Sequence, residues 1–527
     1  MNLARYFLDQ NLEQRAEKVA VRWTAPGPDD DGGVGNGGPE QRYTFAEMHA
    51  WSNRAGNHLR ALGLREEDRV LFALDDNPAY AAHWFGALRV GGVVAMMNPG
   101  IPREDWAYYL AYTRAAVLVS ERRYVDAHAE AIGHALHRGQ LRGVITVDAP
   151  LDVAAQHTLG NECHTVDSSA DDPSVWLFSS GSSGKPKACM HVNGDFIHNT
   201  ENYAKRVLGI REEDVTLGVP KLFFGYATGT NLMFPWAVGA TTCLFSERAT
   251  PERMLTLIDR YRPTILTNVP TMIHRMLEHP RCESTDLGSL RMVLSAGEAL
   301  PAELYRRWTE RTGVEILDGI GSAELFHIYL SNRPGEVKLG TLGKAVPGYQ
   351  LKLVDDDGAE VAAGEIGTLL VGTDDPGNGA SNAYGYHRDR AKSRDTFRGA
   401  WTMTGDQFRM DEDGCYVYCG RADDLLKVGG VYVSPTEVEN CLLTHGRVRE
   451  AAIVGVEKDG LTTTVACVVV STDGGLDGLD RALQEHVKTR LAPHKYPRFV
   501  RFFDVLPRND RGKVARAELK RALLGTL

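Results

Sequence analysis

The chain contains 527 residues, of which 43% are hydrophobic and 24% are charged, and its formal net charge at pH 7 is −10. A chain of this length is too long for one hydrophobic core, so two or more domains are expected. The acidic balance argues against a nucleic-acid-binding protein, which normally carries a basic face, and it would repel anionic lipid. We therefore expect no nucleic-acid partner and no membrane association.

Strand-like apolar runs alternate with helix-like amphipathic stretches through most of the chain. The apolar runs fall at 69–76, 115–120, 143–148, 241–245, 264–269 and 291–298. Pro251–Tyr261 and Pro301–Thr312 have the amphipathic pattern of helices. Gly27–Gly38 is polar and dense in glycine, which indicates a surface loop. The alternation predicts α/β layers with largely parallel sheets.

The sequence pattern changes near Gly420. Two strand-like runs at 451–456 and 463–470 precede a helical pattern at Leu479–Leu491, which is enough for a small α+β domain. The charged seam at 420–424 suits a hinge better than a core strand. The predicted fold is α/β, with a large N-terminal domain of layered sheets and helices at residues 1–420 and a small, mobile α+β C-terminal domain at residues 421–527.

The eight cysteines are scattered and include no CxxC pair. Cys415 and Cys419 are the closest pair, but four residues along a strand span roughly 13 Å, too far for a disulfide or a shared metal. Scattered thiols are typical of a reducing compartment. No apolar run approaches the ~18 residues of a membrane span, and residues 1–20 lack the apolar core of a signal peptide. We expect a cytoplasmic protein.

The most informative motif is WLFSSGSSGKPK at Trp176–Lys187. An apolar run leads into a loop of small residues, in which backbone N–H groups and hydroxyls can surround a phosphate while two lysines add positive charge. The spacing excludes a Walker A loop, because Ser179 stands at the position of its first glycine and Pro186 follows Lys185. Taken alone, the segment would better suit a plain flexible turn.

Five further motifs follow in order along the chain: SAGEA at 295–299, GIGSAE at 319–324, TGD at 404–406, GRADDLLKVGGVYVSPTE at 420–437 and PRNDRGK at 507–513. Together with the loop they resemble the acyl-adenylate-forming superfamily, which includes acyl- and aryl-CoA ligases, luciferases and the adenylation domains of peptide synthetases. The stretches at 221–242 and 316–349 are most similar to the benzoate–CoA ligase subgroup.

The resemblance implies an AMP-forming acid–thiol ligase. ATP and Mg²⁺ would activate an aryl carboxylic acid as acyl-AMP, and the acyl group would pass to the thiol of CoA. An aryl-acid–AMP ligase that loads the phosphopantetheine of an acyl carrier protein is a close alternative. A thioester-forming enzyme that uses a supplied adenylate and a non-catalytic binding protein are lesser ones. We expect a monomer or a homodimer.

The resemblance also assigns residues to ATP. The phosphate loop comprises Ser179, Ser180, Gly181, Ser182, Ser183, Gly184, Lys185 and Lys187. The adenine is lined by Gly297, Glu298, Ala299, Asp318, Gly319 and Ile320. Asp406 would accept hydrogen bonds from the ribose hydroxyls, with help from Arg421. Glu324 would be catalytic as the carrier of Mg²⁺, a hard ion that prefers oxygen ligands.

Residues of the C-terminal domain complete the implied site. Lys513 would bridge the acid's carboxylate and the α-phosphate during adenylation, although an ordinary surface lysine is the alternative in this basic tail. Thioester formation needs room for a thiol, so the domain would rotate between the two half-reactions about Asp423. Gly429 and Gly430 would then line the thiol tunnel.

Two short segments are the implied walls of the acid pocket. The first comprises Phe224, Gly225, Tyr226 and Ala227, and the second comprises Phe326, His327 and Ile328. Aromatic walls suit an aromatic ring, but core packing is the alternative for the phenylalanines. Gly225 stands where the subgroup has alanine and Phe326 where it has leucine. A missing methyl at Gly225 would admit a ring substituent, so we expect a hydroxy- or amino-substituted benzoate.

Two positions near the phosphates depart from the family pattern. Ala188 replaces a glycine, and Ala323 replaces a threonine whose hydroxyl can reach the α-phosphate. The loss of such a hydrogen bond to a charged group would cost ~1.5–3 kcal/mol. Ser322 is the candidate to compensate for it. These departures are the reason for keeping the supplied-adenylate alternative.

Overall fold

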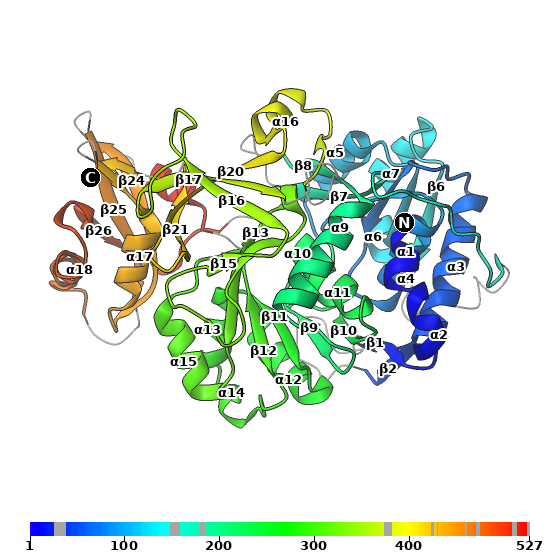
Figure 1. Ribbon diagram of the computed structural model, residues 1–527, viewed down its shortest axis with the longest axis horizontal. Coiled ribbons are helices and arrows are strands. Elements are labelled where there is room, and N and C mark those ends of the chain that lie inside the picture. The colour runs from blue at the N-terminus through cyan, green and yellow to red at the C-terminus, as the bar shows by residue number, and fades with distance from the viewer. Residues whose placement is uncertain are drawn as a thin grey trace.

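The computed structural model describes residues 1–25, 38–147, 159–179, 185–373, 382–422, 426–428, 431–458, 461–470, 475–508 and 514–523. The molecule is elongated, with the C-terminal elements at one end and the N-terminal sheet toward the other (Figure 1). The predicted loop at Gly27–Gly38 lies almost entirely outside the described residues.

A seven-stranded sheet holds most of the N-terminal strands. Its spatial order is β18 (Gly385–Tyr386), β8 (Lys187–Val192), β7 (Pro173–Ser179), β4 (Val93–Met96), β3 (Arg69–Ala73), β5 (Val117–Glu121) and β6 (Gly143–Val147). The pairs from β7 to β6 are parallel, and those of β8 with β7 and β18 are antiparallel. Apolar side chains of α5 (Arg103–Thr113) and α7 (Ala129–His137) cover one face.

A nine-stranded sheet forms the centre of the molecule. Its order is β15 (Lys344–Ala345), β14 (Ile328–Ser331), β13 (Ile316–Gly321), β12 (Met292–Ser295), β11 (Ile265–Asn268), β9 (Val215–Gly218), β10 (Thr241–Phe245), β1 (Val19–Thr24) and β2 (Glu40–Thr44). The strands from β13 to β1 are parallel. Helices α12 (Pro251–Tyr261), α13 (Pro270–Glu278) and α15 (Ala302–Thr312) pack on one face of this sheet.

Buried helices join the two large sheets into one hydrophobic core. Every residue of α4 (Pro78–Arg89) is buried, and Asn77 caps this helix by accepting a hydrogen bond from the Tyr80 amide. The core also includes residues of α3 (Phe45–Ala61), α9 (Asn193–Asn199), the π-helices η3 (Thr200–Val207) and η4 (Gly229–Met233), and α11 (Phe234–Trp236). Helix α10 (Gly225–Thr228) leads directly into η4.

Smaller sheets follow toward the C-terminus. The third sheet is antiparallel and contains β16 (Tyr349–Val354), β17 (Ile366–Thr373), β19 (Phe397–Arg398), β20 (Trp401–Met410) and β21 (Tyr416–Arg421). After it come the hairpin of β22 (Leu426–Val428) and β23 (Val431–Val433) and the sheet of β24 (Val448–Lys458), β25 (Leu461–Val470) and β26 (Phe499–Phe502). Helices α17 (Pro435–Leu443) and α18 (Leu479–Lys488) pack with apolar side chains of this last sheet in one hydrophobic cluster. Helix α19 (Arg516–Leu523) packs with the sheet in a second hydrophobic cluster.

The short helices are α1 (Leu3–Phe7), η1 (Asp9–Asn11), α2 (Leu12–Arg15), α6 (Arg122–Ala127), α14 (Arg281–Ser284), η5 (Ala323–Leu325), α16 (Arg390–Thr396) and η7 (Pro493–Lys495). The α/β prediction of a large N-terminal and a small C-terminal domain is confirmed. All eight cysteines are free thiols. No helix among the described residues is long and apolar enough to cross a membrane.

Candidate active site

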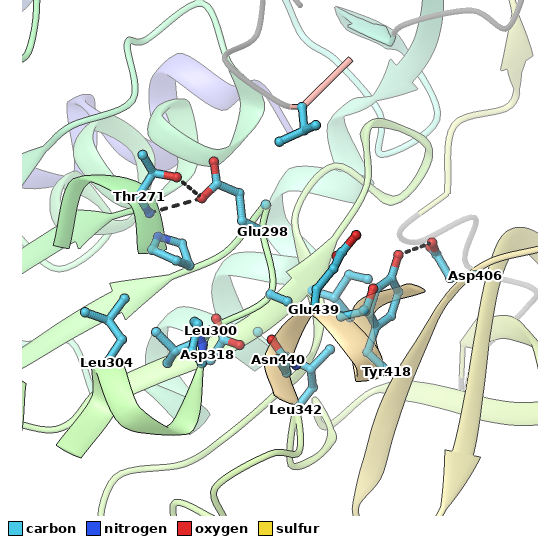
Figure 2. Close-up of a pocket in the computed structure, with 18 of the residues that line it drawn as sticks. Thr271, Glu298, Leu300, Leu304, Asp318, Leu342, Asp406, Tyr418, Glu439 and Asn440 are labelled. Atoms are coloured by element: carbon cyan, nitrogen blue, oxygen red, sulfur yellow. Dashed lines mark hydrogen bonds between the residues drawn. The ribbon is translucent and has the colours of Figure 1, made fainter. Parts of the chain in front are cut away.

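A cleft of about 1450 Å³ runs between the nine-stranded sheet, the antiparallel third sheet and helix α17 (Figure 2). Its lining includes Ser179, Lys187, Gly297, Glu298, Ala299, Asp318, Gly319, Ile320, Ser322, Glu324, Asp406 and Arg421. The structure thus brings together twelve residues that the motifs assign to ATP. Lys185 does not line the cleft, and its Nζ lies 5.2 Å from the ring centroid of Tyr108.

Several predicted site residues lie outside the described part of the chain. They are Ser180, Gly181, Ser182, Ser183 and Gly184 of the phosphate loop, and Asp423, Gly429, Gly430 and Lys513 of the C-terminal part. Described neighbours of Lys513, namely Arg508, Val514 and Arg516, line the same cleft as Glu324 and Asp406.

The predicted adenine residues are brought together by sheet topology. Strands β12 and β13 are parallel neighbours, so their carboxyl ends lie at the same edge of the sheet, where α/β proteins commonly bind ligands. Gly297 follows β12 with a φ of 89°, a left-handed conformation that glycine adopts without strain. This turn brings the backbone of 297–299 against the cleft.

The Glu298 side chain has a structural role that the motif did not reveal. Its Oε2 accepts hydrogen bonds from the amide of Thr271 at 3.0 Å and from the Thr271 hydroxyl at 2.6 Å, as Figure 2 shows. Thr271 is in the first turn of α13, where amide groups have no partner within the helix. The Glu298 carboxylate therefore anchors this helix end beside the cleft.

Asp318 is a buried acid on the cleft wall, with 6% of its surface exposed. Burial raises the pKa of its carboxyl to about 8, although the nearby Ser295 hydroxyl and Gly319 amide act in the opposite direction. The carboxyl is therefore mostly protonated at neutral pH, and Asp318 adds little negative charge to the predicted adenine wall.

Asp406 and Arg421 are brought together by strand register. They are directly paired across β20 and β21, and Asp406 Oδ1 lies 3.4 Å from Arg421 Nη1. The Tyr418 hydroxyl donates to the same oxygen at 3.5 Å (Figure 2). Asp406 is buried but lines the cleft. A carboxylate held in this way can accept hydrogen bonds from paired hydroxyls of a ligand.

Glu324 lies on the short helix η5, with its carboxylate held from a distant part of the chain. The Tyr386 hydroxyl donates to Glu324 Oε1 at 2.8 Å, and the thiol sulfur of Cys189 is 3.7 Å from the same oxygen. Neither contact was predicted, because no local pattern links Glu324 to a tyrosine 62 residues downstream. Tyr386 also lines the cleft.

Lys187 forms an ion pair within the cleft region. Its Nζ lies 2.9 Å from Asp389 Oδ2, and 19% of its side chain is exposed. The hydrogen bond from Lys187 and the Lys392 amide hold the pKa of the Asp389 carboxyl below its usual range. A phosphate group would compete with Asp389 for this ammonium.

The two predicted acid-pocket segments pack against each other, and none of their residues lines the cleft. His327 Nε2 lies 3.0 Å from the carbonyl oxygen of Tyr226, so this nitrogen carries the proton and donates it. Burial lowers the pKa of the imidazole to about 3, which keeps the ring neutral. Phe224, Gly225, Ala227 and Ile328 belong to the same two segments and are outside the set that lines the cleft.

Phe326 occupies a strained turn. Its φ of 64° and ψ of −57° are those of a γ-turn of the rare kind, closed by a hydrogen bond of 2.7 Å from the His327 amide to the Leu325 carbonyl. The side chain is buried against Phe196, with ring centroids 4.4 Å apart. The core-packing alternative therefore describes the Phe326 ring, which does not line the cleft.

Gly225 lies against the same turn. A Cβ at this position would be 3.0 Å from Leu177 Cδ1 and 3.1 Å from the carbonyl oxygen of Phe326. The absence of a side chain thus allows close approach of protein atoms. The space that a Cβ would take at Gly225 is bordered by these protein atoms, so this contact does not support the prediction of extra room for a ring substituent.

Comparison with known proteins decides the family. Residues 8–386 match the model of the AMP-binding enzyme family, and residues 437–513 match the AMP-binding enzyme C-terminal domain. The chain belongs to the AMP-binding enzyme family. The benzoate–CoA ligase of Thauera aromatica is 43% identical over 486 residues, which cover 91% of each chain.

Two further similar proteins are also named as CoA ligases of aromatic acids. The 4-hydroxybenzoate–CoA/benzoate–CoA ligase of Rhodopseudomonas palustris is 38% identical, with coverage of 99% of this chain and 94% of the relative. The crystal structure of the anthranilate–CoA ligase AuaEII in complex with anthranoyl-AMP is 35% identical and superimposes with a TM-score of 0.90, covering 100% and 98% of the two chains. The resemblance to the acyl-adenylate-forming superfamily and its benzoate–CoA ligase subgroup is confirmed.

The chemistry of Glu324 fits the Mg²⁺ that this AMP-binding family implies. A single carboxylate together with substrate phosphates is a common way to hold Mg²⁺, which keeps several waters. The described residues contain no cluster of three or more His, Cys, Asp or Glu side chains suited to a metal. Glu324, oriented by Tyr386, would be the protein ligand.

Replacing Tyr386 with Phe is expected to raise the Mg²⁺ concentration needed for half-maximal activity by about tenfold, because outer-shell partners of a metal ligand typically change metal affinity by that order. The KM for the acid should stay unchanged. Pyrophosphate release against a Mg²⁺ titration measures the first effect, and equilibrium Mn²⁺ binding in the presence of ATP measures it without turnover. Tyr384→Phe, at a tyrosine that is 53% exposed, is the control. An unaltered metal titration would rule out this role.

Proposed function

We propose that this AMP-binding enzyme is an aryl-acid–CoA ligase. With ATP and Mg²⁺ it converts an aryl carboxylic acid to aryl-AMP and pyrophosphate, and the thiol of CoA then displaces AMP to give the aryl-CoA. The single observation that carries the proposal is the convergence of twelve motif residues on one cleft. Relatives named for benzoate, 4-hydroxybenzoate and anthranilate support the aryl class of acid.

In the first half-reaction, negative charge moves onto the pyrophosphate leaving group, so oriented cations and donors lower the barrier. Lys187 supplies charge at the phosphates once it leaves Asp389, and Lys513 draws the carboxylate to the α-phosphate. Asp406 and Arg421 fix the ribose. Mg²⁺, when bound at Glu324, neutralises phosphate charge. Ser322 and Ala323 line the cleft at the positions next to Glu324, where the family threonine is absent.

The second half-reaction needs the Lys513 segment to leave. In this proposal residues 421–527 rotate about Asp423, and Gly429 and Gly430 then border the passage for the pantetheine arm. In this proposal the acid binds against the wall that the segments 224–227 and 326–328 form together. The acid we propose is a benzoate that carries a hydroxyl or amino group. CoA is preferred over a carrier protein as the acceptor, because the relatives are named as CoA ligases.

The proposal is tested by acid-dependent pyrophosphate release from purified protein with ATP and Mg²⁺. Benzoate, its hydroxy and amino derivatives and aliphatic acids are compared, each with and without CoA. We expect release with aryl acids only and aryl-CoA as the product when CoA is added. Adenylate that CoA does not consume would favour a carrier protein. A protein that makes aryl-CoA only from synthetic aryl-AMP would favour the supplied-adenylate alternative.

A further inference from the structure

A buried carboxylate outside the cleft connects the two large sheets. Asp76 follows β3 of the seven-stranded sheet and is 1% exposed. Its Oδ1 accepts a hydrogen bond of 2.8 Å from the amide of Leu222, which follows β9 of the nine-stranded sheet. The Ser246 hydroxyl, beyond β10, donates to the Asp76 carbonyl oxygen at 3.1 Å. Asp76 thus joins the ends of strands from both sheets.

The residue before Leu222 is fixed as well. Lys221 Nζ donates a hydrogen bond of 2.6 Å to the carbonyl oxygen of Phe245 and lies 3.5 Å from the centroid of the Phe245 ring. Burial lowers the pKa of Lys221 to about 8 and raises that of Asp76 to about 6. The attraction between the two opposite charges opposes both shifts, and Glu247 also favours the charged lysine while Arg253 disfavours it. Each of the two charges is therefore stabilised by the other.

A series of hydrogen bonds continues from Leu222 to the aromatic segment. The Thr228 hydroxyl donates to the Leu222 carbonyl at 2.6 Å, and the Phe224 amide donates to the Lys221 carbonyl at 2.9 Å. The Thr228 amide donates to the Phe224 carbonyl at 3.0 Å. The carbonyl of Tyr226 accepts from His327 Nε2. Hydrogen bonds thus connect the segment 221–228 to Asp76 at its beginning and to His327, which follows the γ-turn at Phe326, at Tyr226.

We propose that Asp76, with Lys221 as its charge partner, is a positioning residue for the aryl-acid pocket. In this proposal Asp76 fixes the position of the segment 221–228 so that Phe224 and Tyr226 face the acid. The inference rests on the proposed function, because it assumes that this segment binds the ring. Asp76 itself does not touch the substrate, so its removal should act on the acid and leave ATP binding unchanged.

The test uses single and paired substitutions in the full-length enzyme. Asp76→Asn keeps an oxygen for the Leu222 amide but removes one of the two negative charges, Asp76 and Glu247, that favour the charged Lys221. Lys221→Met removes the positive charge that favours the ionised form of the buried Asp76. Each is expected to raise the KM for the aryl acid about tenfold and to change the KM for ATP less than twofold, because small displacements of a binding wall have effects of this order or larger.

The double variant Asp76→Asn/Lys221→Met removes both charges and keeps the acceptor for Leu222. It should recover most of the acid KM of the wild type, whereas Asp76→Ala/Lys221→Met, which lacks the acceptor, should not. If a single variant fails to fold, this pair of double variants still decides the question. Asp214→Asn is the matched control, since Asp214 is also 1% exposed, accepts from a backbone amide and pairs with Arg291.

Equal increases in the KM values for acid and ATP, or no recovery in the charge-free double variant, would overturn the positioning role. The relative kcat/KM values for benzoate and its larger substituted derivatives add a second readout, because a displaced segment should narrow the difference between them. A wild-type protein that activates no aryl acid would overturn the proposed function itself. An active wild type with unaffected variants would overturn this inference alone.

Discussion

Replacing Asp406 with Ala is expected to lower kcat/KM for ATP by about 10²- to 10⁴-fold. The carboxylate would lose two charge-assisted hydrogen bonds to the ribose, each worth ~1.5–3 kcal/mol. Asp406 is 7% exposed and is held by Arg421 and Tyr418, so a bound ribose would meet an already oriented acceptor. Initial rates of pyrophosphate release against ATP concentration provide the measurement.

The control for this variant is Asp356→Ala, at an exposed aspartate just after β16 in the same antiparallel sheet. Its kinetics should match those of the wild type. Because 44% of the Arg421 side chain is exposed, the loss of its partner should cost little stability, and both variants should unfold near the wild-type temperature. A kcat/KM for ATP within threefold of wild type in Asp406→Ala would remove this residue from the nucleotide site.

Gly229→Ala should be both destabilising and harmful to acid binding. A Cβ at this position would lie 2.5 Å from His327 Cδ2 and 2.7 Å from His327 Nε2, and 3.0 Å from Phe234 Cζ. The imidazole would have to move away from the Tyr226 carbonyl, with a loss of ~1–3 kcal/mol in unfolding free energy. We expect the KM for the aryl acid to rise about tenfold or more, with the KM for ATP unchanged.

The chain offers an opposite control. Gly133 lies in the exposed face of α7, and no atom comes within 4 Å of the Cβ that alanine would add. Gly133→Ala should raise the unfolding free energy by ~0.5–1 kcal/mol, the usual gain in a helix interior. Urea denaturation of both variants measures the contrast. If Gly229→Ala were also stabilising, His327 would have an accessible second position and its proposed place in the pocket wall would be wrong.

Local sequence patterns predicted the framework well. The apolar run at 241–245 is β10 and the amphipathic stretch Pro251–Tyr261 is α12, both with the predicted bounds. Other predicted strands are shorter, as with β12 at Met292–Ser295, because the residues that follow turn toward the cleft. Periodicity identifies strands and helices, and parallel topology then gathers the motif residues at one sheet edge.

The side-chain arrangement of the site could not be predicted in the same way. The pairing of Glu298 with Thr271 and of Tyr386 with Glu324 depends on contacts between residues 27 and 62 positions apart. The inward turn of the Phe326 ring depends on a positive φ that sequence does not favour for an aromatic residue. Motif order located the cleft residues, whereas their hydrogen-bond partners required the fold.

The π-helices η3 and η4 have a consequence for comparing relatives of this protein. Both segments contact the pocket region, since the Tyr203 ring of η3 lies 5.5 Å from that of His327, and Gly229 of η4 adjoins the same imidazole. A π-turn accommodates one residue more than an α-turn. A homologue that lacks that residue would continue as an α-helix, and each later side chain would be rotated by about 100°. Single-residue gaps at 200–207 or 229–233 therefore mark a change in pocket shape, and substrate assignments transferred across such a gap should be measured anew.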